Sequence, residues 1–330
     1  MSGRTGFREM LAMLLALMTL AAAAFVPTAG ADSGCTPGTL TLPSGALYPN
    51  GIARAADGTL YVGLVTSGQI LRKPPHEAWQ TLFKGSDTVF ASTTLRLDER
   101  RGLLWGNSPD FLPTGKSRAH RIFALDIATA TVTRNLVLPA GTMGNDIVLA
   151  PDGTVYLTET KVGSILRLGP DDRDFQWVLR DARLAGPGGL GASGIVREED
   201  GTLMVANFGT GKIYILGNAQ QVPRLREMEL PRTLENPDGM GLAPDGSLIV
   251  LENAIQSGQG KVLRIAEPLA PGRRVIEVIR EGLESPVNLT ITAQGCAFVS
   301  EARIRHRLLA GHEAEVPERF QIHEIPLGIR

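Results

Sequence analysis

The sequence predicts an all-β fold, a six-bladed β-propeller with four-stranded antiparallel blades around a central channel. Three observations predict it: an internal repeat with six copies, short stretches that alternate between apolar and polar residues within each copy, and no long amphipathic helical pattern. A repeat of about 40 to 50 residues is typical of propellers, in which each copy forms one blade. Alternation with a period of two is the pattern of a strand with one buried face.

The repeat is clearest at 236–251, where Asn-Pro-Asp-Gly-Met-Gly-Leu is followed by Ala-Pro-Asp-Gly and an apolar run. Four other copies keep this internal spacing, and one more has an extra residue in its turn. Successive copies follow at steps of 43, 52, 48, 45 and 49 residues. The blades are therefore expected to begin near residues 50, 93, 145, 193, 238 and 287.

Each copy is expected to supply four strands. The first two flank an Asp-Gly turn in most copies, because Gly tolerates positive φ and Asp bonds its own backbone in a tight hairpin. In the first copy the strands are expected at 51–56, 59–64, 69–73 and 78–84, and later third strands at 121–125, 163–167, 211–215 and 260–264. The fourth strands are more polar and face water, at 130–138, 175–179, 224–230 and 274–279. A strand within 36–43 is expected to close the ring.

Length and charge limit the classes of protein that fit. With 330 residues, of which 43% are hydrophobic, the chain can bury a large core in one closed domain. The net charge is −1, with mixed signs. Nucleic acid is not an expected partner, because its binding requires a basic face. We expect a monomer that acts on a small molecule.

The first 31 residues have the layout of a secretory signal. Arg4 and Arg8 precede an apolar run at 10–26, and small residues end at Ala31. Removal of 1–31 would leave the propeller at 32–330, without a membrane span, in the periplasm or outside the cell. The alternatives are an uncleaved anchor, for which the run is slightly short, and a lipoprotein acylated at Cys35, for which Asp32 is an unfavourable neighbour.

Cys35 and Cys296 are the two cysteines of the chain. In the oxidising compartment that export implies, we expect them to pair. The bridge would join the N-terminal segment to the last repeat, and closing so long a loop can contribute about 5 kcal/mol. The alternative is two separate thiols.

Polar residues recur just before the first strand of each copy, where that strand meets one mouth of the channel. They are Asn50, Thr93, Asn145, Ser193 and Asp238, with Asp146 and Asn288 one position further along. The second strand runs antiparallel, so its far end is expected to bring Asn107, Glu159, Asn207, Glu252, Asn253 and Glu301 to the same mouth. His120, at the end of the long connection 107–120, is the one histidine expected to reach it. Each of these residues can also serve simply to cap a turn.

Carboxylates gathered in one enclosed space repel each other and are costly to desolvate, unless a positive charge lies among them. Oxygen ligands from Asp, Glu and Asn suit Ca²⁺ best, and Mg²⁺, Mn²⁺ or Zn²⁺ are alternatives. The sequence therefore predicts a divalent cation, calcium first, at the channel mouth.

Two stretches carry a resemblance to a known family: Pro237-Asp238-Gly239-Met240, which precedes the Asp245-Gly246 turn, and the pair Asn145-Asp146. Over about residues 45–310 the chain resembles the senescence-marker-protein/gluconolactonase family of six-bladed propellers. Paraoxonases, strictosidine-synthase-like proteins and NHL-repeat proteins are more distant relatives. Paraoxonase-like members also have a bridge between the N-terminal segment and the last blade.

The resemblance implies that Asp238 binds a metal and acts as general base, and that Asn145 and Asp146 bind metal-bound water or substrate. This chain has Asn50 where the family has a Glu, and Ser193 where it has an Asn. The expected metal ligands are Asn145, Asp238, Asn50, Ser193 and Asn288.

We therefore expect an exported, metal-dependent hydrolase of a lactone or related ester. The cation would polarise the carbonyl group while Asp238 or Asp146 activates water. Substrate contacts are expected from Asn145, Glu159, Asn207, Glu252, Glu301 and His120. The chain has no Gly-x-Ser-x-Gly motif, so a serine nucleophile is not expected. The alternatives are a non-catalytic NHL-type propeller that binds a protein, glycan or small ligand, and a strictosidine-synthase-like enzyme that uses one Glu.

Overall fold

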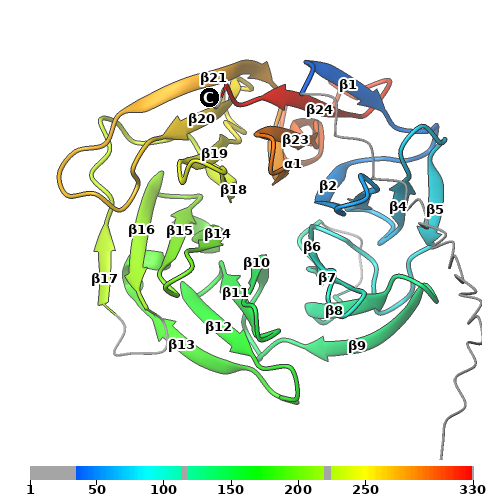
Figure 1. The fold of residues 1–330 in the computed structure, drawn as a ribbon, viewed down its shortest axis with the longest axis horizontal. Coiled ribbons are helices and arrows are strands. Elements are labelled where there is room, and N and C mark those ends of the chain that lie inside the picture. The colour runs from blue at the N-terminus through cyan, green and yellow to red at the C-terminus, as the bar shows by residue number, and fades with distance from the viewer. Residues whose placement is uncertain (1–34, 113–116, 219–223, 329–330) are drawn as a thin grey trace, which may run out of the picture. The chain divides into compact units, whose positions relative to one another are not determined.

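The computed structural model describes residues 35–112, 117–218 and 224–328, and it confirms the six-bladed propeller. The chain divides at Ala31 into two units, and the described residues all belong to the second, Asp32–Arg330. Within that unit, six four-stranded sheets surround a common axis (Figure 1). The segment 1–31, expected to be a secretory signal, lies outside the described residues. No helix of the described part is long and apolar enough to cross a membrane.

Five blades are each built from four consecutive strands, of which the first is innermost. Blade 1 comprises β2 (Pro49–Arg54), β3 (Leu60–Leu64), β4 (Ile70–Lys73) and β5 (Gln80–Phe83). Blade 2 comprises β6 (Thr94–Asp98), β7 (Leu103–Ser108), β8 (Arg121–Asp126) and β9 (Thr131–Val137). Blade 3 comprises β10 (Gly144–Leu149), β11 (Val155–Glu159), β12 (Ser164–Leu168) and β13 (Gln176–Arg180).

The later blades follow the same plan, except for the last. Blade 4 comprises β14 (Ala192–Arg197), β15 (Leu203–Asn207), β16 (Lys212–Gly217) and β17 (Arg224–Glu227). Blade 5 comprises β18 (Pro237–Leu242), β19 (Leu248–Glu252), β20 (Gly260–Ile265) and β21 (Ile276–Leu283). Blade 6 comprises β22 (Pro286–Ile291), β23 (Cys296–Glu301), β24 (Gln321–Pro326) and the N-terminal β1 (Gly38–Thr41).

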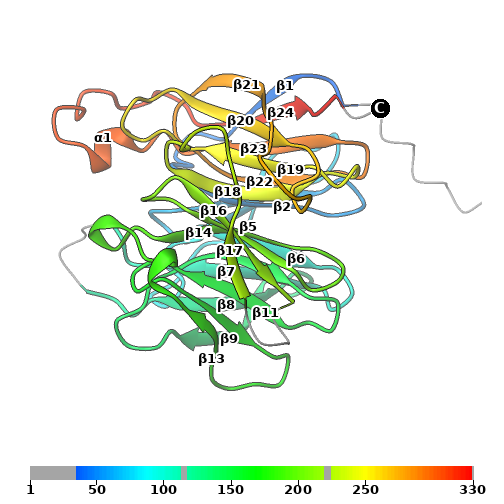
Figure 2. The same ribbon diagram turned by 90° about the vertical axis from the view of Figure 1, so that its left-hand side faces the viewer.

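Three short helical turns lie outside the sheets. The α-helix α1 (Arg305–Leu308) belongs to the excursion between β23 and β24, and it lies to one side of the strands (Figure 2). Two 3₁₀ turns, η1 (Ala182–Leu184) and η2 (Pro187–Gly189), lie in the connection that leads into blade 4. α1 and the end of this connection both border the cavity described below.

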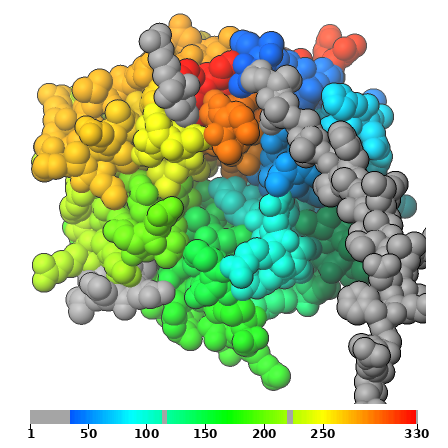
Figure 3. Space-filling view, viewed as in Figure 1, coloured from blue at the N-terminus to red at the C-terminus, as the bar shows by residue number. Residues whose placement is uncertain are grey.

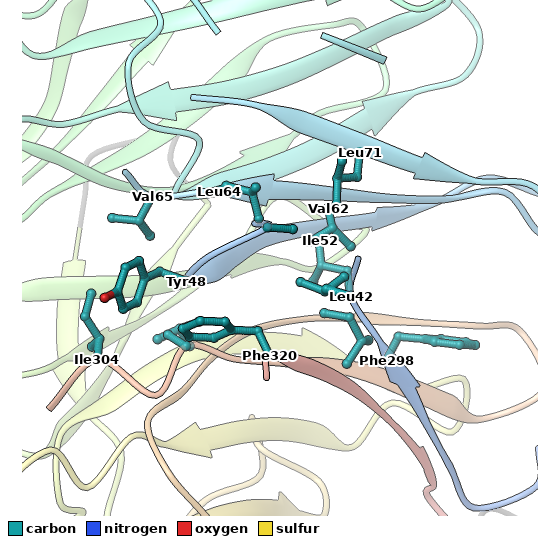
Figure 4. Packing of buried hydrophobic residues seen from close by; sticks show 14 of the residues in the cluster. Leu42, Tyr48, Ile52, Val62, Leu64, Val65, Leu71, Phe298, Ile304 and Phe320 are labelled. Carbon is teal, nitrogen blue, oxygen red and sulfur yellow. The ribbon is translucent and has the colours of Figure 1, made fainter. Parts of the chain in front are cut away.

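The two ends of the chain meet in blade 6, as the sequence predicts. β1 pairs antiparallel with β24 from Gly38↔Glu324 to Thr41↔Gln321. The expected Cys35–Cys296 disulfide is formed, so Cys35 is not a free thiol. Leu42, just after β1, packs with Ile52 of blade 1 and Phe298 of blade 6 in the cluster that joins the first and last blades (Figure 4). Sheet pairing, a covalent bond and apolar packing therefore all close the ring.

The core lies between successive blades. One cluster joins Trp105 and Ile122 of blade 2 to Ile147 and Leu157 of blade 3, and each of these side chains is at most 3% exposed. This packing explains why each repeat has apolar residues on both faces of its inner strands. Each blade therefore depends on its neighbours for burial of its faces.

The inner strand of five blades carries an irregularity at its start. In blade 3, Gly144 pairs with Glu159 and Ile147 with Leu157, so Asn145 and Asp146 lie opposite the single residue Thr158. The equivalent register shifts occur in blades 1, 4, 5 and 6, while β6 of blade 2 pairs regularly. A bulge of this kind re-aims side chains, and it directs the polar repeat position toward the axis.

Candidate functional site

A cavity of about 570 Å³ lies at one mouth of the central channel. Its floor is formed where the inner strands begin, and its rim is formed mainly by connections of blades 2 to 6. On the face drawn in Figure 3 the surface is hollowed at the centre of the ring, where the blades meet. Several expected site residues line the cavity: Asn50, Thr93, Asn145, Asp146, Asp238, Asn253, Asn288 and His120.

Asp238 is the most perturbed acid of the cavity. It stands on the bulge at the start of β18, and its Oδ2 accepts a hydrogen bond of 3.0 Å from Asn253 Nδ2. Burial raises the pKa of the Asp238 carboxyl to about 8; the Asn253 hydrogen bond opposes the rise, and the charge of Asp146 adds to it. Asp238 lies deep in the ring, yet part of its surface remains open to the cavity. A carboxyl that changes its charge near neutral pH can exchange protons with a bound molecule.

Asp146 has a different environment, because an arginine neutralises it. Arg96 of β6 donates from Nη2 to both carboxylate oxygens, at 2.7 and 2.9 Å, and from Nη1 to Asn288 Oδ1 at 3.1 Å. Thr94 Oγ1 donates to Asp146 Oδ1 at 2.5 Å, and the Ile195 backbone N–H donates to Oδ2 at 3.2 Å. The Asp146 side chain is only 3% exposed. The negative charge of Asp146 is therefore paired within the protein.

The positive charge expected among these carboxylates is thus supplied in part by the chain. Sequence reasoning missed Arg96, although the repeat contains a signal for it. Its position on the inner strand is occupied in the other copies by Ala53, Val148, Val196, Gly241 and Thr290. An arginine where the other blades have a small or uncharged residue indicates a charge that needs a partner among the inner strands.

At the repeat position directly after Asn50, Asn145 and Asp238, three blades have a larger side chain in place of glycine. These three side chains contact each other around the axis. Gly51, Gly194 and Gly239 hold this position in blades 1, 4 and 5, and a Cβ at Gly194 would lie 2.0 Å from Asp238 O. The other blades have Thr94, Asp146 and Asn288 there. Asn288 Nδ2 donates to Thr94 Oγ1 at 3.2 Å, and Thr94 in turn donates to Asp146. With Arg96, these side chains form a network that spans the channel, named here the hub network.

His120 reaches the cavity, as the sequence suggests. Its Nδ1 accepts a 2.9 Å hydrogen bond from the backbone N–H of Asp110, so the neutral ring carries its proton on Nε2. Burial lowers the pKa of His120, Asp110 opposes this effect, and Lys161 adds to it. The Asp110 carboxylate is itself held by Arg118, with Nη2 to Oδ1 at 2.7 Å. His120 is thus a neutral hydrogen-bond donor at the rim.

Ser193 does not line the cavity, contrary to its expected place among the metal ligands. Its side chain is fully buried, and Oγ donates to the backbone carbonyl of Pro237 at 2.7 Å. The hydroxyl group of Ser193 therefore binds the neighbouring inner strand, β18, and not the cavity. Ser193 joins blades 4 and 5.

The residues at the ends of the second strands also turn away from the cavity. Glu159, Asn207, Glu252 and Glu301 were expected to contact substrate, but none of them lines the wall. Each lies directly opposite a residue that precedes the bulge, as in the pairs Gly144↔Glu159 and Pro237↔Glu252. From there the side chain points into its own blade and binds the connection that enters it.

Their partners show this structural role. The backbone N–H of Met143 donates to Glu159 Oε1 at 2.9 Å, that of Glu235 to Glu252 Oε1 at 2.7 Å, and that of Glu284 to Glu301 Oε1 at 2.7 Å. Asn207 Nδ2 donates to the carbonyls of Arg183 and Ala185 at 3.1 and 3.0 Å. These four side chains replace backbone partners that the entering loops lack.

The residues present can be tested for a divalent cation. Among the described residues, the single cluster of three close Cys, His, Asp or Glu ligand atoms is Cys35, Cys296 and Glu324, and its two sulfurs form the disulfide. Of the five expected ligands, Asp238, Asn50 and Asn145 still offer a side-chain oxygen in the cavity, since Asn288 Oδ1 already accepts from Arg96 and Ser193 does not line the wall. This oxygen-only set fits a hard cation. It brings at most one negative charge, so tight binding is not expected.

No protein-family model and no curated protein matches the sequence. Solved structures do match. The luciferin-regenerating enzyme is 13% identical, with 89% of this chain and 97% of that chain covered and a TM-score of 0.63. A gluconolactonase from Xanthomonas campestris is 17% identical, with coverages of 89% and 91% and a TM-score of 0.63. Virginiamycin B lyase from Staphylococcus aureus is 14% identical, with coverages of 88% and 99% and a TM-score of 0.58.

These comparisons establish a class by fold. The chain is a six-bladed propeller of the kind found in the gluconolactonase and the luciferin-regenerating enzyme, and the resemblance seen in the sequence is confirmed at that level.

Proposed function

We propose that the protein hydrolyses a lactone or a related ester in the cavity, with Asp238 as general base. The observation that carries this proposal is the buried Asp238 carboxyl at the cavity floor, whose pKa is raised to about 8. Asp238 suits the role better than Asp146, because both oxygens of Asp146 are engaged by Arg96. The gluconolactonase-like fold supports a hydrolase of this class.

In the proposed reaction, Asp238 accepts a proton from water while the water oxygen bonds to the carbonyl carbon. The amide groups of Asn50 and Asn145, which also line the cavity, donate to the carbonyl oxygen as it becomes negative. The ring C–O bond then breaks, and the released alcohol oxygen takes the proton back from Asp238. The product is a hydroxy acid.

We also propose that a divalent cation, calcium by its donor preference, can bind beside Asp238. Asp238, Asn50 and Asn145 would hold it, and it would supply polarisation of the carbonyl group. A neighbouring cation would favour the charged form of Asp238. Arg96 already balances Asp146, so the expected affinity is low.

Export of the protein remains part of the proposal. The Cys35–Cys296 bridge supports an oxidising compartment, either the periplasm or the outside of the cell. The cavity suits a small molecule, and we expect the protein to act as a monomer.

The proposal can be tested by following acid release from a panel of lactones. Asp238→Asn should lower kcat/KM by about 100-fold or more, whereas Asp245→Asn, in a turn outside the cavity, should not. Without added metal, kcat/KM of the native protein should rise with pH as Asp238 loses its proton near pH 8. Chelation followed by calcium addition tests the cation separately. Undiminished hydrolysis by the Asp238→Asn protein would refute the proposed base.

A second candidate function is a non-catalytic propeller that binds a small ligand. The charge balance of the site favours it, because Arg96 neutralises Asp146 and Asp238 is uncharged below pH about 8. Ligand binding without turnover, equal in the native and Asp238→Asn proteins, would support this function. The strictosidine-synthase-like alternative lacks support, since no glutamate of the described residues lines the cavity.

A further inference from the structure

The cavity is divided into a polar floor and an apolar mouth. Its floor, at the starts of the inner strands, carries the amide and carboxyl groups of residues such as Asn50, Asn145 and Asp238. Its mouth is formed by connections between later strands, and these supply apolar side chains: Phe111, Phe208, Leu190, Ile255, Ile304 and Leu308. A single ligand that fills the cavity therefore meets polar groups at one end and hydrocarbon along the other.

The apolar side chains come from separate parts of the ring. Phe111 follows β7 of blade 2, Phe208 follows β15 of blade 4, and Ile255 follows β19 of blade 5. Ile304 precedes α1 of blade 6 and is only 5% exposed. These four side chains form an enclosing wall from four blades, which distinguishes the mouth from a patch on one loop.

Two leucines extend this wall into solvent. Leu190, beyond η2, is 47% exposed, and Leu308, in α1, is 43% exposed, yet both line the cavity. Exposed apolar side chains are ordinary when scattered, but a group of them around a cavity entrance marks a binding surface. Both leucines gain burial when an apolar ligand lies between them.

Several polar groups at the mouth are already held by other groups of the protein and are not free to bind a sugar lactone. Asp110 is held by Arg118, and His120 Nδ1 is held by the Asp110 backbone. Lys161 is the one lysine or arginine among the described residues that line the cavity. A polyhydroxylated ring needs a partner for each buried hydroxyl group, and each one left unpaired costs binding.

We infer that the substrate is a lactone or ester with an apolar chain. This inference rests on the proposed function for the identity of the reacting group, while the apolar chain is inferred from the mouth alone. The carbonyl group lies at the floor beside Asp238, and the chain lies along Phe111, Phe208 and Ile255 toward Leu190 and Leu308. A volume of about 570 Å³ is within the range of cavities that bind ligands of drug-like size.

The test uses matched series of γ-lactams and γ-lactones that carry a methyl, butyl or octyl substituent, with glucono-δ-lactone for comparison. The lactams are not hydrolysed readily, so calorimetry on the native protein measures binding alone. Each methylene buried in the mouth should tighten binding by up to about fourfold. For the lactones, kcat/KM should rise with the same chain length and exceed that of glucono-δ-lactone.

The double variant Leu190→Ser/Leu308→Ser should flatten the dependence on chain length. Val275→Ser is the matched control, because Val275 is 77% exposed and does not line the cavity. Three results would each overturn the inference. The dependence on chain length could survive in the double variant, the affinity of the native protein could be independent of chain length, or the native protein could prefer glucono-δ-lactone.

The outcomes also separate the inference from the proposed function. The lactams could bind more tightly with longer chains while the lactones are bound but not hydrolysed. That result would refute the proposed hydrolase activity and support an apolar ligand. Hydrolysis of glucono-δ-lactone without binding of the octyl lactam would do the reverse. If neither series binds, both are overturned.

Discussion

Replacement of Asp238 by asparagine should change how the stability of the propeller depends on pH. The pKa of Asp238 is raised in the folded protein to about 8, from an ordinary value of 3.8. Between these values the folded protein holds a proton that the unfolded chain has released. Stability contributed by the protonated Asp238 is therefore lost as the pH rises toward 8. Asparagine has the same shape and no proton to lose.

The magnitude follows from proton linkage. One proton bound by the folded state alone lowers the free energy of unfolding by about 1.4 kcal/mol for each unit of pH. From about pH 5.5 to about pH 7.5, the native protein should lose nearly 3 kcal/mol relative to Asp238→Asn, as an upper limit. Part of Asp238 is open to the cavity, so water offsets some of this cost, and about 2 kcal/mol is expected.

Urea unfolding of both proteins at several values of pH, with chelator present and the disulfide intact, measures this difference. The native and Asp238→Asn curves should converge toward pH 5 and diverge toward pH 8. Asp245→Asn serves as control, because the pKa of Asp245 is lowered, with hydrogen bonds from Ser247 and the charge of Arg264 overcoming its desolvation. It should shift stability by a constant amount across this range.

Parallel curves for the native and Asp238→Asn proteins between pH 5.5 and 7.5 would refute the reasoning. They would mean that Asp238 is ionised in the folded protein at neutral pH. The cavity would then carry the negative charge of Asp238 at neutral pH, and this charge would favour binding of a cation.

Three further sets of substitutions test the residues that stabilise the blades around the site. Arg96→Met should lower the free energy of unfolding by about 3 to 5 kcal/mol, because it leaves the buried Asp146 unpaired, and adding Asp146→Asn should recover part of the loss in urea unfolding. Cys35→Ser with Cys296→Ser should lower it by about 2 to 5 kcal/mol, measured by the same method. Glu252→Gln should reduce the melting temperature but leave lactone hydrolysis unchanged, because Glu252 binds Arg232 and does not line the cavity.

The fold could be predicted from the sequence because several copies of the repeat carry the same pattern of strands and turns. Asp-Gly turns and alternating strands recur at one spacing, so an uncertain copy is corrected by the others. The N-terminal strand was expected from the need to close a ring, and the Cys35–Cys296 bridge from the oxidising compartment that export implies. Chain closure is a property of the whole fold, and it is visible once the number of repeats is known.

The prediction of the candidate site was correct for residues of the first strand of several blades, and wrong for most of those at the end of the second strand. Asn50, Asn145 and Asp238 were placed correctly because they lie at the start of the inner strands, where a bulge directs them to the axis. Glu159 and Glu252 were placed at the correct end of the second strand but on the wrong side. Strand direction determines the end of the channel that a residue reaches, whereas its side depends on the bulge, which the sequence does not reveal.

Two neighbouring carboxyl groups of the cavity, Asp146 and Asp238, illustrate why one acid is suited to chemistry and the other is not. Asp146 shares the hub network with Arg96, Thr94 and Asn288, so its negative charge is paired and its oxygens are occupied. Asp238 has only the neutral Asn253 as a side-chain partner among the described residues, and it feels the charge of Asp146 in addition. Environments that separate two neighbouring acids in this way commonly divide structural from catalytic roles. In this propeller a built-in guanidinium stabilises one acid, and the second is left poised to gain or lose its proton in contact with a ligand.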